Sequence, residues 1–526
     1  MKRFLLILFL GISLISGAQD RDIYRQMDKM SSLLRLVNDW YVDTPAMDHL
    51  IEEAIVSLLE ELDPHSVYIS ADELRKMNEP LEGEFEGVGI QFNLHDDTIL
   101  VVSPISGGPS EKLGILAGDK IITIDGDTVA GVGFTNNDVQ KSLRGKKGSK
   151  VIVGIKRFGL KDLIEFEIER DKIPIYSVDA GYMINDKVGY IKVNRFARKT
   201  VEEFSEKLKT LEGEGMKSLV LDLRGNSGGY LNTAIDLADE FMEKGQLVVY
   251  TQGRNFPKDE KFATNKGKFE KGKLVILIDE GSASASEIVT GAIQDMDRGL
   301  VVGRRSFGKG LVQKPYMLPD RSAIRLTISR YYTPSGRSIQ RPYDKGKDAY
   351  YDLIDDRFES GEVFSADSIK LPDSLKYSTK NGRTVYGGGG IVPDIFVPLD
   401  TNGRSDYYLN VLRKGHFNSY TLEVLDGERK KLKKEFSSVD AFIKGYPIEA
   451  KVKEFTDYAA DKGLEYDEEG YMESKDKIDN LLLAYLARGV WDVSAYYQVI
   501  NSIDPTVKVA VESLDDKNFK SYLSKP

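Results

Sequence analysis

The chain has 526 residues, of which 41% are hydrophobic and 30% charged, and its formal net charge at pH 7 is -10. This length predicts two to four domains, and the acidic balance excludes a generally basic surface, so we expect no nucleic-acid partner. Cysteine is absent, which excludes disulfides, thiol catalysis, a lipid-modified N-terminal cysteine and cysteine-ligated zinc.

The first eighteen residues have the pattern of a secretory signal peptide. Lys2 and Arg3 precede an apolar run over residues 4–15, and small residues follow as far as Ala18. The run is shorter than the roughly 20 apolar residues that span a bilayer, and no later stretch reaches that length. We therefore expect cleavage after Ala18, export to the periplasm and no permanent membrane span.

Two amphipathic helices are predicted to open the mature protein. Apolar residues recur at helical spacing across residues 22–40 and again across residues 50–62. Asp48 is expected to cap the second helix, and Asp63-Pro64 to end it. We expect these helices to pack on the core or on another subunit. They and the C-terminal tail are therefore candidate elements for a homo-oligomer.

A small β-rich module is predicted to follow. Residues 164–169 alternate between apolar side chains and glutamates, which is typical of a half-buried strand. The module is expected to contain strands at 89–93, 98–103, 120–125, 151–156 and 163–169, and short helices at 109–113 and 137–143.

From residue 188 to residue 332 the pattern changes to alternating strands and helices. Strands are expected at 218–223, 247–250, 274–278 and 300–302, and helices at 231–242 and 288–296. Such units predict an at least partly parallel sheet with functional loops at the carboxyl ends of its strands. Beyond residue 401 the chain becomes charged and helical, and no chemistry is assigned to it.

Two turns rich in glycine and serine, at 224–229 and 281–286, follow two of the predicted buried strands. We expect both turns at one edge of one sheet. A serine that lies between very small residues directly before a helix is surrounded by free backbone N–H groups, which acyl transfer needs for its oxyanion. Alternatively, each turn is only a tight strand-to-helix connection, since glycine and serine dominate turns generally.

A nucleophilic serine needs a base. The four histidines, His49, His65, His95 and His416, lie outside the predicted α/β core, so a Ser/His/Asp triad is disfavoured, and His65 is interpreted as a loop residue. A buried lysine can act instead, because burial disfavours its charged form. Lys309 lies between two glycines after a predicted strand, and a side-chain oxygen four residues later could hold its amine.

Residues 303–310 nearly match the phosphate-binding loop G-x-x-x-x-G-K-[ST]. Gly310 replaces the hydroxyl residue that binds magnesium, and residues 311–318, with a proline inside, are expected to be extended rather than helical. The sequence therefore argues against a nucleotide-binding enzyme.

Four motifs occur in order along the chain: Leu-Asp-Leu-Arg-Gly-Asn-Ser-Gly-Gly at 221–229, Gly-Ser-Ala-Ser-Ala-Ser-Glu-Ile at 281–288, the run 303–313, and Tyr-Thr-Pro-Ser-Gly-Arg at 332–337. Together they closely resemble the C-terminal processing peptidases, which are tail-specific serine proteases of the S41 type. The similarity extends from Leu-Asp-Pro-His-Ser at 62–66 to Gly-Ile-Val-Pro-Asp at 390–394.

The resemblance implies roles for individual residues. Ser284 would be the nucleophile, Lys309 the general base and Gln313 the residue that orients the lysine, while the N–H groups of Ala285 and Gly228 would form the oxyanion hole. It also implies that the β-rich module is a PDZ domain. In such a domain the glycine loop and strand start, here Gly87, Val88, Gly89 and Ile90, bind a terminal carboxylate.

The resemblance further implies a crotonase-like (ClpP-like) peptidase core with an inserted PDZ domain. Together with the helical patterns at both ends of the chain, this predicts an α/β protein with helical N- and C-terminal regions. The expected segments are the signal peptide (1–18), a helical region (19–80), the PDZ domain (81–170), the peptidase core (171–400) and a helical extension (401–526).

The expected function is a serine endopeptidase that needs no metal or cofactor. Its PDZ domain would recognise apolar C-terminal tails of exported proteins. The alternative is an exported protein that binds peptides without cleaving them.

Overall fold

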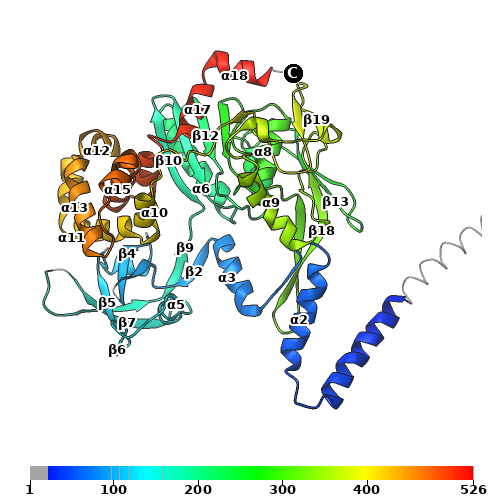
Figure 1. The fold of residues 1–526 in the computed structure, drawn as a ribbon, viewed down its shortest axis with the longest axis horizontal. Coiled ribbons are helices and arrows are strands. Elements are labelled where there is room, and N and C mark those ends of the chain that lie inside the picture. Colours follow the sequence, from blue (N-terminus) through cyan, green and yellow to red (C-terminus); the bar gives the residue numbers. More distant parts are fainter. Residues whose placement is uncertain (1–21, 96, 106, 117, 158, 525–526) are drawn as a thin grey trace, which may run out of the picture.

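The computed structural model describes residues 22–524, except 96, 106, 117 and 158 (Figure 1). The predicted signal peptide lies outside the described residues. Within the described part, no helix is both long and apolar enough to cross a bilayer.

The core is a six-stranded sheet in the order β10-β11-β12-β15-β16-β21. Neighbouring strands from β11 onward run parallel, and β10 is antiparallel to β11. The central strands are continuous apolar runs because helices cover both faces of the sheet. The strands are β10 (Val178–Asn185), β11 (Val188–Val193), β12 (Ser218–Asp222), β15 (Lys273–Ile278), β16 (Leu300–Gly303) and β21 (Ile395–Phe396).

Each face of this sheet has its own apolar cluster. One cluster joins Ile191, Leu221 and Ile276 to side chains of α6 (Thr200–Gly213), α7 (Leu231–Asp239) and α8 (Ala285–Asp295). On the other face, α17 (Pro505–Ser513) and α18 (Asp516–Leu523) contribute residues such as Val507 and Phe519. The chain's last helices are therefore part of the core around this sheet.

A second sheet lies beside the core sheet. The strand predicted at 247–250 is present as β13 (Leu247–Gln252), and it pairs antiparallel with β14 (Asp259–Phe262) and β18 (Ala323–Tyr332) of this second sheet. A short apolar run does not reveal which sheet it joins. β18 also pairs with β17 (Leu311–Met317), which is extended as predicted, and with β1 (Val67–Ile69).

The predicted β-rich module is a separate sheet with its own core. All five predicted strands are present within two residues of their expected bounds. The module contains β3 (Ile90–His95), β4 (Thr98–Pro104), β5 (Lys120–Ile124), β6 (Asp127–Thr128), β7 (Lys150–Lys156), β8 (Ile164–Glu169), α4 (Pro109–Lys112) and α5 (Asn136–Leu143). A ribbon of β2 (Glu84–Gly87) and β9 (Asp171–Pro174) joins it to the core.

The charged region beyond residue 401 forms a helical domain beside this module (Figure 1). Its apolar core is rich in aromatic side chains, including Phe417, Phe442 and Phe455. The helices are α10 (Asp406–Arg413), α11 (His416–Glu435), α12 (Val439–Gly445), α13 (Ile448–Asp461), α14 (Glu468–Glu473), α15 (Lys475–Val490) and α16 (Val493–Ile500).

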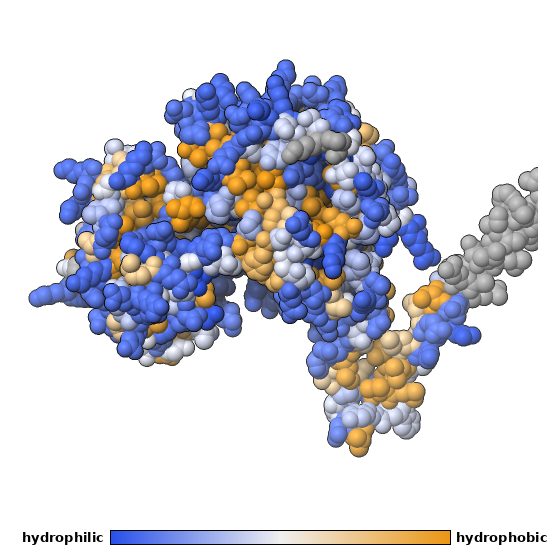
Figure 2. All heavy atoms as spheres, turned by 45° about the horizontal axis from the view of Figure 1, so that its top comes forward, coloured by the Kyte–Doolittle hydropathy of each residue, from blue (hydrophilic) through white to orange (hydrophobic). Residues whose placement is uncertain are grey.

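The N-terminal helices form an arm that projects from the body (Figure 1). Residues 22–40 and α2 (Met47–Glu60) are helical as predicted. Asp48 is not the cap of α2, because the helix starts one residue earlier, after Ala46, and Asp48 lies in its first turn. Of the two expected packing partners, the core covers little of α2, whose one buried residue is Leu59. Packing on another subunit stays a prediction. The arm instead exposes apolar side chains (Figure 2), among them Met27, Leu33, Leu36, Trp40 and Leu58.

Candidate active site

The two predicted turns meet at the carboxyl edge of the core sheet, as expected from parallel pairing of β12 with β15. Ala283 N donates to Asn226 O at 3.0 Å, so the turns touch directly. Asp279 ties them again, because its Oδ1 accepts Gly225 N at 2.8 Å and Gly281 N at 3.0 Å. The edge is therefore a rigid platform of two interlocked turns.

Ser284 lies at the start of α8 in a strained conformation. Its φ is +54°, in the left-handed region that residues other than glycine rarely adopt. Such strain persists only where the surroundings enforce it, and it is concentrated at functional sites. The N–H of the next residue, Ala285, donates to no acceptor in the described part of the chain. A serine hydroxyl thus lies beside an unused N–H at a helix N-terminus.

Gly228 lies against this serine. A Cβ added to Gly228 would come within 2.9 Å of Ser284 Cβ and 3.1 Å of Ala285 N, so a larger residue would clash with Ser284. Its φ of +107° also requires glycine. The N–H of Gly228 is engaged in this conformation, since it donates to Asn226 Oδ1 at 2.9 Å.

Lys309 lies on the turn after β16, and its side chain is largely buried. Its Nζ donates to Gln313 Oε1 at 3.1 Å, which is the contact expected from their spacing. Gln313 Nε2 in turn donates to the carbonyl of His65. Burial is the main cause that lowers the pKa of Lys309 to about 8, and the nearby positive charge of Arg325 lowers it further.

A buried carboxylate, Glu287, joins the serine and lysine turns. Its Oε2 accepts the backbone N–H of Ser284 at 2.8 Å and that of Lys309 at 2.9 Å. Its Oε1 accepts Ser306 Oγ at 2.5 Å and Gly308 N at 2.7 Å. Burial raises the pKa of Glu287 to about 7, while these four donors favour the ionised form. The sequence analysis missed this residue.

Tyr331 strengthens the same junction, because its hydroxyl lies 2.5 Å from Lys309 O and 3.1 Å from Ser284 O. The two reactive side chains themselves are not hydrogen-bonded. Among the described residues, neither Ser284 Oγ nor any other hydroxyl accepts from or donates to Lys309 Nζ. The backbone segments that carry Ser284 and Lys309 are thus held together, but their side chains do not form a hydrogen bond with each other.

His65 is a loop residue, as interpreted from the sequence, but it is buried beside the site. Its Nε2 lies 2.9 Å from the hydroxyl of Tyr350. Burial, with a smaller contribution from the charge of Lys309, lowers the pKa of His65 to about 4, so the ring is neutral at pH 7. Its carbonyl holds Gln313, which links the N-terminal segment to the lysine.

The residues expected to bind peptide lie where β2 leads into β3. Gly89 has a φ of +77°, and its N–H donates to no acceptor in the described residues. Gly87 belongs to β2, Val88 is buried and Ile90 begins β3. β3 pairs only with β4 in the described part of the chain, so its other edge is open. In the described ranges, no three histidine, aspartate or glutamate side chains converge as metal ligands.

Comparison with known proteins agrees with this arrangement. A family model described as peptidase family S41 matches residues 187–345, a PDZ domain model matches residues 87–179, and a family of unknown function matches residues 407–492.

Two curated relatives match this chain over about three quarters of their own length. The carboxy-terminal-processing protease of Bartonella bacilliformis is 39% identical over 343 residues, which are 63% of this chain and 78% of the relative. The carboxy-terminal processing protease CtpB of Bacillus subtilis is 35% identical over 365 residues, 69% of this chain and 74% of the relative. A solved structure, the photosystem II D1 C-terminal processing protease, is similar at 28% identity with a TM-score of 0.34, over 58% of this chain and 88% of that one. The chain therefore belongs to peptidase family S41, as a carboxy-terminal processing serine protease that carries a PDZ domain.

Proposed function

We propose that this enzyme cleaves exported proteins through an acyl-enzyme on Ser284, with Lys309 as the general base, in a crotonase-like core. The observation that carries the proposal is the shared carboxylate oxygen of Glu287, which brings a strained serine and a buried lysine of lowered pKa to one point. A lysine with a pKa near 8 is partly neutral at physiological pH and can accept a proton.

The reaction needs only these side chains and water. Ser284 Oγ attacks the peptide carbonyl carbon while its proton moves to Lys309 Nζ. The tetrahedral intermediate collapses, the C–N bond breaks, and Lys309 gives the proton to the leaving amine. Water then attacks the ester, Lys309 takes the water's proton, and Ser284 regains it when the acid leaves. Gln313 keeps Nζ in place through its 3.1 Å hydrogen bond.

The oxyanion would be stabilised by the backbone N–H groups of Ala285 and Gly228. Ala285 supports this role because its N–H is unused, and Gly228 because of its close approach to Ser284. Gly228 must exchange its hydrogen bond with Asn226 for one with the oxyanion. The side chains of Ser284 and Lys309 also lack a mutual hydrogen bond. From both observations we infer that this conformation precedes substrate binding.

Substrate selection is assigned to the PDZ domain. The N–H of Gly89 would bind the terminal carboxylate with its neighbours in the loop of Gly87, Val88 and Ile90, and the open edge of β3 would pair with the tail. The predicted signal peptide supports export, and we propose the periplasm as the location.

The test is cleavage of an unfolded protein that ends in apolar residues, followed by mass spectrometry. We expect fragments from the substrate whose C-terminus is free. Cleavage should be at least about tenfold slower when the same C-terminus is amidated, because the amide cannot replace the carboxylate. Equal cleavage of both forms would contradict tail recognition. Binding without cleavage would favour the non-catalytic alternative.

A further inference from the structure

The outer face of β3 borders the cleft between three parts of the molecule. Ile90, Phe92 and Leu94 pack against the core of the PDZ domain, so the alternate residues, Gln91 among them, point outward. Ser103 of β4 lies opposite Gln91 on the same face, and its Oγ donates to Gln91 Oε1 at 3.2 Å. The outward face of the predicted tail-binding strand is therefore polar.

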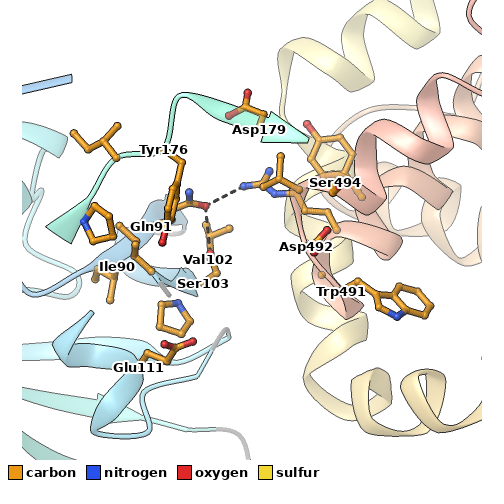
Figure 3. Close-up of a pocket in the computed structure, with 18 of the residues that line it drawn as sticks. Ile90, Gln91, Val102, Ser103, Glu111, Tyr176, Asp179, Trp491, Asp492 and Ser494 are labelled. Carbon is orange, nitrogen blue, oxygen red and sulfur yellow. Dashed lines mark hydrogen bonds between the residues drawn. The ribbon is translucent and has the colours of Figure 1, made fainter. Parts of the chain in front are cut away.

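The helical C-terminal domain forms the opposite wall of this cleft, whose volume is about 1070 Å³ (Figure 3). Tyr485, Arg488 and Gly489 of α15 line it, as do the loop and first residues of α16, including Trp491 and Ser494. The third wall, at residues 174–179, 194–195 and 203–207, belongs to the core. No catalytic role has been assigned to this domain, yet it lies across the cleft from the strand that would bind substrate.

Arg488 crosses the cleft towards β3. Its Nη2 donates to Gln91 Oε1 at 3.0 Å, which is the contact shown by the dashed line between the two walls in Figure 3. No carboxylate in the described ranges lies within ion-pair distance of this guanidinium. A permanently charged group thus faces a neutral amide across the cleft.

Three acidic residues that line the cleft already accept hydrogen bonds from other groups. Asp492 caps α16 by accepting Ala495 N at 2.9 Å. Glu111 accepts Gly107 N at 2.7 Å, and Asp179 binds the side chain of Asn194. None of these carboxylates forms an ion pair with Arg488 in the described part of the chain, so its guanidinium can pair with an acidic ligand.

The register of a bound tail follows from the site of its carboxylate. If the carboxylate lies at Gly89, at the start of β3, the tail must run antiparallel to β3. Residues directly opposite each other in such a pair point to the same face of the sheet. The terminal side chain, opposite Ile90, then points into the apolar interior, and the penultimate side chain, opposite Gln91, points into the cleft at Arg488.

We propose that the helical C-terminal domain selects substrates at their penultimate residue, and that Arg488 favours an acidic side chain there. The preferred tail thus ends in an acidic residue followed by an apolar one. This inference rests on the proposed recognition of C-terminal tails by the PDZ domain. It gives the domain of unknown function a place in substrate selection.

The test measures peptide binding to the full mature chain carrying Ser284→Ala, so that nothing is cleaved. Fluorescent ten-residue peptides with an apolar terminal residue would carry Glu, Gln or Lys at the penultimate position, and a second series would vary the preceding position. We expect Glu to bind about five- to tenfold more tightly than Lys at the penultimate position, the size of one charge contact at a half-buried site. High salt should reduce this ratio.

Two further variants make the result specific. Arg488→Gln should reduce the ratio of Glu to Lys affinity to about one, and Arg488→Lys should retain part of it. Arg413→Gln is the matched control, because this exposed arginine of α10 carries the same charge in the same domain. An unchanged ratio in Arg488→Gln, or an equal loss in Arg413→Gln, would overturn the proposal. If free and amidated peptides bind equally, tail recognition itself fails, which is a different result.

Discussion

At the scale of single residues, Glu287 holds the active site together. Its carboxylate accepts four hydrogen bonds, one from Ser284 and three from residues 306–309. The backbone N–H groups of Ser284 and Lys309 both donate to the same oxygen, Oε2. Its position therefore controls the distance between the backbones of Ser284 and Lys309.

Glu287→Gln should lower kcat by at least about a hundredfold. The substitution replaces one carboxylate oxygen by an NH2 group, which faces N–H or O–H donors and cannot accept hydrogen bonds from them. The thermal midpoint should also fall, since buried donors lose their acceptor. The measurement is kcat with melting followed in parallel, and Glu212→Gln, at an exposed position on α6, is the control. Unchanged turnover in Glu287→Gln would contradict this role.

Activity should rise with pH from about pH 6 to about pH 9. Lys309, with a pKa lowered to about 8, must be neutral to accept a proton, and Glu287, with a pKa raised to about 7, must be ionised to accept its four donors. Both requirements are met only on the alkaline side, so log kcat/KM should climb and then level above about pH 9. A profile that falls over this range would exclude a neutral lysine as the base.

The sequence indicated the proposed catalytic residues but not the buried residues that hold them in place. The expected contact between Lys309 and Gln313 follows from their spacing within one segment and is present. Glu287 could not be distinguished from an ordinary helix residue, because its partners lie around residues 306–309. His65 lies 248 positions from Gln313, and no local pattern predicts their contact.

At the scale of elements, α17 reaches the turn that carries Gly228. Its cap, Asp504, accepts Arg224 Nη1 at 2.7 Å through Oδ2. Arg224 also pairs with Asp222, which Lys192 contacts at 3.3 Å. Two carboxylates and two cations thus balance one another in a largely buried cluster at the base of the turn.

Asp504→Asn should lower kcat about tenfold with little change in KM, because the turn loses its anchor while the substrate groove is unaffected. Asparagine caps helices as well as aspartate does, so α17 should remain folded. Asp515→Asn is the matched control, since Asp515 caps α18 without contacting Arg224. Unchanged kcat in Asp504→Asn, or equal losses in both variants, would contradict the anchor.

The helices and strands of the core were predictable where the periodicity of a single segment was enough to identify them. Periodicity placed β12, β15 and α8, and the carboxyl-edge rule brought their turns together. Periodicity also placed β13 but could not say which sheet it joins, because its partners β14 and β18 are chosen by tertiary packing. Likewise, nothing in the sequence of the tail indicated that α17 and α18 cover the core sheet. These helices pack on strands that lie far earlier in the chain, and local sequence patterns do not predict such long-range contacts.

At the scale of the whole molecule, the N-terminal arm exposes several large apolar side chains. Met27, Leu33 and Leu36 are 58%, 54% and 60% exposed. Large apolar side chains that gather on one exposed segment are typical of association surfaces, and the expected homo-oligomer stays a prediction.

The mature chain should therefore have a mass in solution of at least a dimer, measured by light scattering. Met27→Glu combined with Leu33→Glu should reduce the mass to that of a monomer, because burying two carboxylates in an apolar interface is costly. A wild-type chain that is monomeric at micromolar concentration would contradict this prediction.

The central claim is that Ser284 and Lys309 form one catalytic unit, and single substitutions of each test it most directly. Ser284→Ala and Lys309→Ala should each reduce cleavage of an unfolded substrate by at least about a thousandfold, with no further loss in the double variant, because residues that act as a unit are not additive. Both should melt within a few degrees of the unmodified chain. Substantial cleavage by a folded Lys309→Ala enzyme would contradict the account.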